Sequence, residues 1–488
     1  MPQSAPAAIA WPKSRTVGAL GLWLAGLLAL LGALPFAVVR YPQMVDYPSH
    51  LARYHVMLDN GGSAHLGRFY AFQWRWSGNL GVDLLIGPLA RLTGLETAGW
   101  LIAALIPVLT GAGLIAIEWT SRRRIGIGAV LAMMAIWSPA LRMGFLNFTL
   151  ALALALLAFA GWIALAGRRW RPALFVPAGL AVWLCHMSGW GVLGLMVLGH
   201  EWHRQRNLPR AVLATWPLWT PLVPMLLLGG AASGLNWGPD VLAYKKDILV
   251  QALRGDWRLL DIACVGLLIL AMVEARSRRA LDWGLMAPAL LVLAAALALP
   301  RHLGGGDFAD ARLVPVFLML GCLAIDLKVP RRVLLLAAAA VALRLGLAAA
   351  TWDGQSRELD RLLTTLDHVP PGARVASAVA DDTAAWSYPV FSHIGAYATL
   401  RRGALVNAHF ALPGVHMLRL RTVGPWFADP SQRVAWRSGQ PVDLSRFAPA
   451  AEAEYLWYVG PRDKLTLPPG ARPVFTTDRS LLVQLAPG

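Results

Sequence analysis

Long apolar runs recur along most of the chain and are separated by short polar connections. Runs of about 17 to 25 apolar residues have the length of a helix that crosses a bilayer. We therefore expect an α-helical polytopic membrane protein with about eleven transmembrane helices. The two weakest runs, the fifth and the sixth, also fit one re-entrant pair around Cys185 and His186. The predicted spans are 17–39, 95–118, 125–140, 145–166, 172–187, 189–200, 211–229, 259–274, 283–300, 312–329 and 333–351.

Arginine and lysine residues gather in every second connection between these spans. Cytoplasmic connections carry an excess of the two residue types, so their positions predict the orientation of the chain. The N-terminus is expected in the cytoplasm, and an odd number of spans places the C-terminus on the periplasmic side. The basic connections contain Lys13 and Arg15; Arg122, Arg123 and Arg124; Arg168, Arg169 and Arg171; Arg204, Arg206 and Arg210; Arg276, Arg278 and Arg279; and Lys328, Arg331 and Arg332.

Three longer segments are then expected outside the membrane: the first outer loop 40–94, the connection 230–258 and the tail after residue 352. The tail has no long apolar run, and its periodicity is helical from Ser356 to Leu366. Short strand patterns between Pro and Gly turns follow, which predict a small α/β domain. These strand patterns lie at 373–380, 455–459, 473–477 and 481–485.

The chain is accordingly divided into a cytoplasmic tail 1–16, a transmembrane domain 17–351 and a periplasmic α/β domain 352–488. Composition agrees with this division. The 488 residues are 57% hydrophobic and 15% charged, with a mean hydropathy of +0.52, whereas soluble domains contain about 25% charged residues. The net charge of +17 comes largely from the connections, so we expect no nucleic-acid partner. The three cysteines lie in apolar segments and predict neither a disulfide nor a cysteine zinc site.

The polar stretch from Asp46 to Arg53 follows the first span closely and is the strongest candidate site. Pro48 fits the first turn of a helix that would run to about Leu58. In that helix Asp46, His50 and Arg53 lie near one face, at spacings of four and three residues. One interpretation is that Asp46 only caps the helix. The other, favoured by its position at the outer membrane surface, is that these side chains form a site.

Further candidates lie in the outer segments. The first outer loop also contains Arg75 and Asp83, and its segment 80–92 is amphipathic and expected to lie along the membrane interface. Lys245 lies in the second outer segment. Each of these residues could instead contact lipid head groups or solvent. Between the ninth and tenth spans, three glycines are flanked by polar side chains that form either a polar turn or an anion site. These side chains are Arg301, His302, Asp307 and Arg312.

This arrangement resembles the GT-C superfamily, the membrane glycosyltransferases that use polyprenyl-phosphate-linked sugars. The acid at the family's position after the first span is Asp46, in Asp46-Tyr47-Pro48-Ser49-His50, and the large first outer loop and the outer C-terminal domain match in arrangement. Many members carry a second acid later in this loop, for which Asp83 is the match. The usual acidic pair is absent from positions 46–47. The resemblance therefore leaves two alternatives, a divalent metal such as Mg²⁺ or Mn²⁺ or no cofactor.

The resemblance implies a glycosyltransferase of the bacterial inner membrane that transfers a sugar, with inversion, from a polyprenyl-phosphate donor to a lipid or glycan acceptor at the periplasmic face. Asp46 would be the catalytic base, and His50 would orient it or bind the sugar. Arg53 and Arg312 would bind the donor phosphate, with Arg301 or Lys245 as alternatives. Arg75, Asp83, His302 and Asp307 complete the expected substrate site.

Two other classes of function remain open. A transporter or flippase of lipid-linked sugars would carry charged residues inside its spans. Arg344 is the main charge in the middle of a predicted span, so the sequence favours a site at the membrane surface. A membrane scaffold without catalytic activity, whose outer domain binds partners, is the third class.

Overall fold

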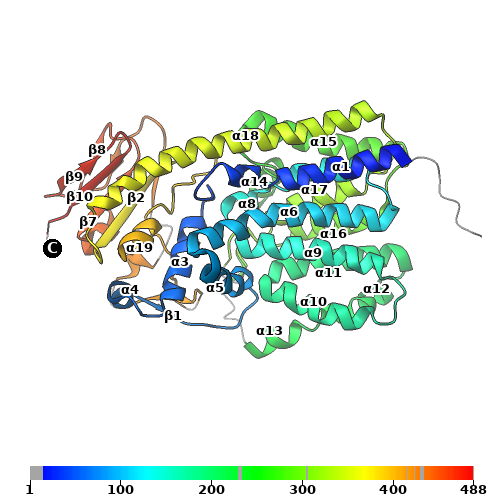
Figure 1. The fold of residues 1–488 in the computed structure, drawn as a ribbon, viewed down its shortest axis with the longest axis horizontal. Helices are drawn as coiled ribbons and strands as arrows, with labels where there is room; N and C mark the ends of the chain where they lie inside the picture. The colour runs from blue at the N-terminus through cyan, green and yellow to red at the C-terminus, as the bar shows by residue number, and fades with distance from the viewer. Residues whose placement is uncertain are drawn as a thin grey trace, which may run out of the picture.

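The computed structural model describes residues 15–228, 234–303, 306–413, 415–421, 424–428 and 433–486. Gly304 and Gly305 of the predicted glycine turn, and nearly all of the tail 1–16, lie outside these residues. The protein consists of a long helical bundle with a mixed α/β part at one end, and short helices of the first outer loop lie between the two (Figure 1).

Every predicted span coincides with helical structure in the bundle. The spans 125–140 and 211–229 are each broken into short helices, because Pro139, Pro217 and Pro221 interrupt the backbone hydrogen bonds. The long helices are α1 (Arg15–Leu31), α6 (Leu95–Arg122), α9 (Leu146–Ala164), α10 (Arg171–Cys185), α11 (Met187–Gln205), α15 (Arg258–Ser277), α16 (Trp283–Ala298), α17 (Leu313–Leu323) and α18 (Arg331–Leu363). The short ones are α2 (Leu34–Ala37), α7 (Ile127–Ala132), α8 (Pro139–Met143), α12 (Leu208–Ala214) and α13 (Leu222–Leu228).

Three helices within the described ranges are long and apolar enough to cross a membrane by length and composition: Leu95–Arg122, Leu146–Ala164 and Arg331–His368. The count of eleven spans therefore stays a prediction. The weak fifth and sixth runs form two separate helices, α10 and α11. They meet at His186, whose extended backbone ends α10 and whose Nδ1 accepts a hydrogen bond from the Ser188 N–H at the start of α11.

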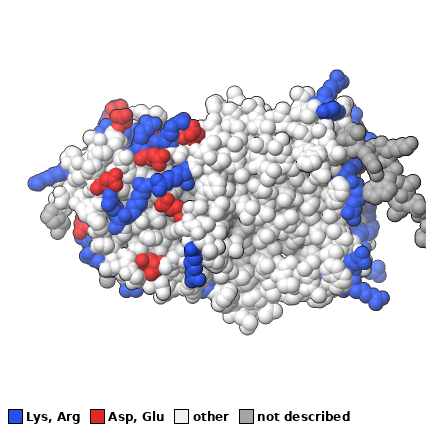
Figure 2. Space-filling view, viewed as in Figure 1, with Lys and Arg blue, Asp and Glu red and all other residues white. Residues whose placement is uncertain are grey.

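Charge is distributed in bands along the long axis. On the face that Figure 2 shows, a broad belt over the helical bundle carries no Lys, Arg, Asp or Glu. The end of the bundle near the start of α1 carries basic side chains, whereas the α/β end carries both signs. A charge-free belt between polar ends is typical of a membrane-embedded protein. The basic end agrees with the predicted cytoplasmic side, and the orientation itself stays a prediction.

The helices of the outer segments lie between the bundle and the α/β part (Figure 1). The predicted helix 48–58 is confirmed as α3 (Tyr47–Asp59), and the amphipathic segment 80–92 forms α5 (Gly81–Thr93). This helix exposes Leu84, Leu85 and Leu92 while it buries Asp83 and Ile86. The first outer loop also contains α4 (Ala64–Phe69) and the short strand β1 (Tyr70–Phe72), and the second contains α14 (Val241–Val250).

The α/β part is entered by α18, which runs without a break through the predicted domain boundary at 351/352. Its 33 residues correspond to about 50 Å of helix, so no flexible linker separates the two parts. The predicted strands are confirmed as β2 (Arg374–Asp382), β7 (Tyr455–Val459), β9 (Arg472–Thr476) and β10 (Ser480–Gln484).

The sheet has the order β3-β2-β7-β10-β9, with β3 at Leu405–Val406, and β5 (Val434–Trp436) also pairs with β2. Strands β3, β5 and β7 run parallel to β2, whereas β10 is antiparallel to β7 and β9. The strands β6 (Val442–Asp443) and β8 (Leu465–Thr466) form a separate parallel pair, and the helix α19 spans Ala396–Arg402. Strand β1 of the first outer loop pairs with β4 (Leu418–Leu420), which joins this loop to the α/β part.

Candidate functional site

Asp46 lies where the first outer loop enters α3, and the end of α8 holds its backbone. The N–H of Val45 donates to the Arg142 carbonyl at 3.2 Å, and the N–H of Asp46 donates to the Met143 carbonyl at 3.0 Å. Gly144 then has a φ of +86°, and a Cβ there would lie 3.2 Å from the Asp46 nitrogen. A glycine at this position allows the two segments to approach closely.

The Asp46 side chain does not cap α3, because no hydrogen bond joins it to the N-terminus of this helix. Its Oδ1 lies instead 3.6 Å from Nε2 of His393, a residue of the α/β part. The side chain is buried, and this burial raises the pKa of Asp46 to about 7, although the charges of Arg312 and Arg433 lower it in part. The carboxylate is thus available for chemistry near neutral pH.

His393 is oriented by a hydrogen bond. Its Nδ1 lies 2.8 Å from the Ala408 carbonyl, which can only accept, so Nδ1 carries the ring proton and Nε2 turns a lone pair toward Asp46. Burial lowers the pKa of His393 to about 4, so the imidazole is neutral at pH 7. At 3.6 Å from Asp46 Oδ1, Nε2 is a neutral neighbour of the carboxylate and not its hydrogen-bond partner.

Two basic groups lower the pKa of Asp46 by their positive charge, and the first is Arg312, at the N-terminus of α17. Its Nη2 donates to the Asp307 carbonyl at 2.8 Å, and its Nη1 lies 3.4 Å from Nε2 of His186. The guanidinium stands over the ring of Phe145, 4.2 Å from its centroid. The Nε is buried without a hydrogen-bond partner, so Arg312 retains a donor for a ligand.

Arg433 is the second basic group and comes from the α/β part. Its Nε lies 3.4 Å from Oδ2 of Asp381, and its Nη1 donates to Ser392 Oγ at 3.3 Å. Ser392 in turn donates to Asp381 Oδ2 at 2.7 Å. Because Ser392 immediately precedes His393, this network fixes the backbone that presents the imidazole to Asp46. The sequence analysis did not identify Arg433, Ser392 or His393, since no local pattern marks them.

His50 lies beside this site but does not contact the Asp46 carboxylate through its ring. It stacks on Phe410 at 5.7 Å between centroids, and Phe410 also lies 5.1 Å from His393. Burial lowers the pKa of His50 to about 3, and its buried Nδ1 has no hydrogen-bond partner. The structure therefore places His50 in an aromatic wall next to the Asp46–His393 pair, where the prediction that it binds sugar stays open.

Arg53 and Asp83 pair with each other. Arg53 Nη1 and Nη2 lie 2.5 and 3.1 Å from the two carboxylate oxygens of Asp83, and both side chains are buried. Asn147 of α9 also donates to Asp83 at 3.2 Å. This bidentate pair fastens α3 to α5 and occupies both Nη groups of Arg53. The structure thus favours a positioning role for both residues over the predicted contact with donor phosphate.

The other predicted residues are also engaged within the protein. Lys245 Nζ donates to the carbonyls of Ala296 and Leu299, at 2.9 and 2.7 Å, and forms an ion pair with Asp310. Such a saturated ammonium has no donor left for phosphate.

The glycine turn holds a separate group of ion pairs. Arg301 forms a bidentate pair with Asp307, with distances of 2.9 and 3.2 Å, and His302 Nδ1 lies 3.3 Å from the same carboxylate. Arg75 is exposed, and its Nη2 donates to the Val415 carbonyl at 3.0 Å. Of the predicted phosphate ligands, Arg312 is the one that the structure brings into the electrostatic reach of Asp46. Across the described ranges, no three His, Cys, Asp or Glu side chains are placed to hold a metal ion.

A comparison with solved structures finds a likeness to the crystal structure of ArnT from Cupriavidus metallidurans bound to undecaprenyl phosphate. The likeness has a TM-score of 0.51 at 13% sequence identity and covers 95% of this chain and 97% of that chain. No protein-family model matches the chain, and a search of curated proteins found no match. The fold is therefore GT-C-like over nearly the whole chain, as the resemblance implied.

Proposed function

We propose that this chain, with its GT-C-like fold, is a glycosyltransferase that moves a sugar from a polyprenyl-phosphate-linked donor to a lipid or glycan acceptor. The transfer takes place at the periplasmic face of a bacterial inner membrane, with inversion at the sugar carbon. The structural neighbour was crystallised with undecaprenyl phosphate, which supports a donor of this class. The observation that carries the proposal is the buried Asp46 carboxylate. It makes no capping hydrogen bond to α3, and it lies beside the neutral imidazole of His393.

In the proposed reaction Asp46 accepts the proton of the acceptor hydroxyl. The hydroxyl oxygen forms the new bond to the sugar carbon from the face opposite the phosphate, which explains the inversion. The bond between this carbon and the phosphate oxygen breaks, and the polyprenyl phosphate leaves with the electron pair. A positioned base of this kind contributes about 10²–10⁴ in rate, and its pKa is best near the working pH.

The two arginines near Asp46 supply positive charge for the departing phosphate. Arg312 has a buried Nε without a partner, and Arg433 is partly exposed, with 43% of its side chain accessible. Guanidinium groups that are fixed before the reaction stabilise developing negative charge without rearranging. His393 borders the site, with its Nε2 3.6 Å from Asp46 Oδ1. After transfer Asp46 releases its proton to water, because the imidazole, with a pKa of about 4, is a weaker base than Asp46.

The proposal is tested by measuring transfer with the full chain in liposomes. A panel of undecaprenyl-phosphate sugars would be mixed with membrane extracts as acceptors, and released undecaprenyl phosphate would be measured by mass spectrometry. We expect one donor to be consumed and its sugar to appear on an acceptor. If a lipid-linked sugar crosses the bilayer and none is consumed, the flippase alternative replaces the transferase.

The rate of transfer is expected to rise with pH through about 7. Asp46 must be ionised to accept a proton, and burial raises its pKa to about 7. Because the charge of Arg433 lowers this pKa, Arg433→Gln should move the midpoint of the pH profile to higher pH. Arg446→Gln, at an exposed position of the same part, is the matched control and should leave the midpoint unchanged. A midpoint near the ordinary carboxylate value would contradict the assignment.

A further inference from the structure

One segment of the α/β part joins the helical bundle to the candidate site. It is the connecting segment 383–395, which links β2 to α19 through turns and bends. Its first half is bound by the second outer segment of the bundle, and its middle packs on Val45. Its end carries Ser392 and His393 into the candidate site. The position of this segment therefore decides where those two side chains lie.

Arg254, between α14 and α15, holds the first half of the connecting segment. Its Nε donates to the Trp386 carbonyl at 2.6 Å, and its Nη2 donates to the carbonyls of Ala385 and Ser387 at 3.5 and 3.2 Å. The guanidinium also stands over the ring of Tyr388, 4.6 Å from the centroid. Carbonyls outside helices and sheets need other donors, and here one planar guanidinium serves three of them in succession.

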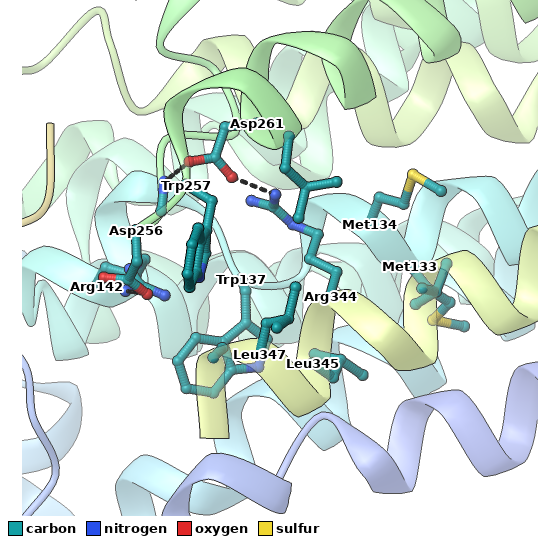
Figure 3. Close-up of a pocket in the computed structure, with 14 residues that line it drawn as sticks. Met133, Met134, Trp137, Arg142, Asp256, Trp257, Asp261, Arg344, Leu345 and Leu347 are labelled. Atoms are coloured by element: carbon teal, nitrogen blue, oxygen red, sulfur yellow. Dashed lines mark hydrogen bonds and ion pairs between the residues drawn. The ribbon is translucent and has the colours of Figure 1, made fainter. Parts of the chain in front are cut away.

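Asp261, in the first turn of α15, forms a second attachment of the same segment. Its Oδ2 accepts a hydrogen bond from Nε1 of Trp386 at 2.8 Å. The carboxylate is itself fixed within the bundle, by an ion pair with Arg344 of α18 and by the N–H of Gly255 at 2.7 Å (Figure 3). Arg344, the mid-span charge that stood out in the sequence, is thereby explained as half of an ion pair. The connecting segment is thus attached to groups that two bundle helices hold in place.

The middle of the connecting segment lies against the residue that precedes the proposed base. Tyr388 and Val390 form a buried cluster with Val45. Asp46 follows Val45 directly, and 12% of its side chain is accessible. The packing of this segment therefore limits the access of water to Asp46.

The end of the connecting segment enters the candidate site. Oγ of Ser392 accepts a hydrogen bond from Arg433 at 3.3 Å. The next residue, His393, lies beside the Asp46 carboxylate. Four residues separate Ser392 from the last carbonyl that Arg254 holds, and one of them is a proline, which restricts the backbone. A displacement at the first half of the segment would therefore reach the site.

We infer that Arg254 is a positioning residue of the candidate site. By holding the connecting segment on the bundle, it keeps His393 beside Asp46 and acts on the site through the segment. The role needs the planar fork of arginine, because an ammonium group cannot match the geometry of three successive carbonyls. The consequence for sugar transfer rests on the proposed function, whereas the hold on the segment does not.

Hydrogen exchange of the full chain in detergent tests the hold without any substrate. In Arg254→Gln we expect peptides that cover 388–394 to exchange about tenfold faster than in the wild type, which is the loss of about one charge-assisted hydrogen bond. Peptides of β7 report on the rest of the α/β part and should be unchanged. Exchange of the segment at the wild-type rate would overturn the inference. An equal acceleration in β7 would also overturn it, because the whole fold would then have loosened.

Labelling of Asp46 measures the effect at the site itself. A water-soluble carbodiimide with an amine modifies accessible carboxyl groups, and mass spectrometry identifies the modified residue. We expect Asp46 to react about tenfold faster in Arg254→Gln, in step with the exchange of the segment. Arg258→Gln is the matched control, because Arg258 is exposed and stands 5.6 Å from the centroid of the Trp386 ring, while the hydrogen bonds to the carbonyls come from Arg254. Equal labelling in Arg254→Gln and the control would contradict the positioning role.

Arg254→Lys is the second variant and carries the test if Arg254→Gln does not fold. It keeps the charge but not the fork that reaches three carbonyls, so it should also accelerate exchange of the segment. A wild-type exchange pattern in Arg254→Lys would overturn the inference.

Sugar transfer shows what the positioning means for catalysis. In Arg254→Gln we expect kcat to fall about tenfold or more while KM for the donor is kept, because the segment is displaced and Arg312 is not. A loosened segment with an unchanged kcat would overturn the catalytic consequence. If the wild type transfers no sugar from any donor and the segment still loosens in Arg254→Gln, the proposed function fails and the hold of Arg254 on the segment stands.

Discussion

Asparagine in place of Asp46 is expected to abolish sugar transfer and, at the same time, to stabilise the protein against unfolding. An amide cannot accept the proton of the acceptor hydroxyl, so the contribution of the base, about 10²–10⁴ in rate, is lost. The gain in stability follows from burial, which raises the pKa of Asp46 from 3.8 to about 7. Above pH 7 the folded protein must hold a buried ion that the unfolded chain hydrates, and asparagine removes this penalty.

The sign of the effect on stability depends on pH. A carboxyl whose pKa is raised on folding stabilises the folded state most below its unfolded pKa, and this contribution is lost as pH rises through the folded value. The difference between the variant and the wild type should therefore be largest above pH 7, on the order of 2–4 kcal/mol in the free energy of unfolding. Thermal unfolding in detergent at about pH 5 and pH 8 measures it.

The matched control is Asp247→Asn, because Asp247 is an exposed acid of the second outer segment. This variant should retain transfer and unfold like the wild type. Normal turnover in Asp46→Asn would rule out Asp46 as the base. A loss of turnover together with a lower unfolding temperature would mean instead that the carboxylate is a structural group.

Alanine in place of Arg53 is expected to be the most destabilising change in the outer loop. It leaves the Asp83 carboxylate buried without its bidentate partner, which costs about 3–5 kcal/mol in comparable buried pairs. The measurement is thermal or denaturant unfolding of Arg53→Ala, with Arg68→Ala as the control at an exposed position of the same loop.

The double variant Arg53→Ala/Asp83→Ala separates the two roles that Arg53 could have. If the pair is structural, removing both charges should restore part of the stability that the single change removes. If Arg53 binds donor phosphate, the single variant should fold normally and lose donor affinity, and the double variant should regain nothing. The second result would return Arg53 to the phosphate site.

The elements of the fold that could be predicted are those whose signal is local. Helix α3 begins at Tyr47 because Pro48 fits a first turn, and β7 is an unbroken apolar run between turns. The breaks within the spans 125–140 and 211–229 were not foreseen, because apolarity alone does not show where proline interrupts a helix. The continuity of α18 through position 351 was not foreseen either. The side chains of this helix change there from apolar to polar, which the sequence pattern indicates as a domain boundary, although the helical backbone continues.

The sequence identified two of the four residues that the structure brings together at the candidate site. Asp46 and Arg312 stand in polar stretches beside apolar runs, and that contrast makes them visible in the sequence. His393 and Arg433 come from the α/β part, and only the packing of this part on the first outer loop brings them near Asp46. Conversely, Arg53, Lys245 and Arg301 resembled ligand-binding residues because a sequence does not distinguish a charge that awaits a ligand from one that has a partner inside the fold.

The contact between Asp46 and His393 has a consequence for biosynthesis. The acid is made among the first residues of the chain, whereas its imidazole neighbour follows only after all the predicted spans. During synthesis the ribosome must therefore complete the whole bundle before the acid acquires this neighbour. A chain that ends before residue 393 would contain Asp46 and the arginine of α17 but not the imidazole beside Asp46, so the candidate site is complete only when the α/β part has been made and has packed on the first outer loop.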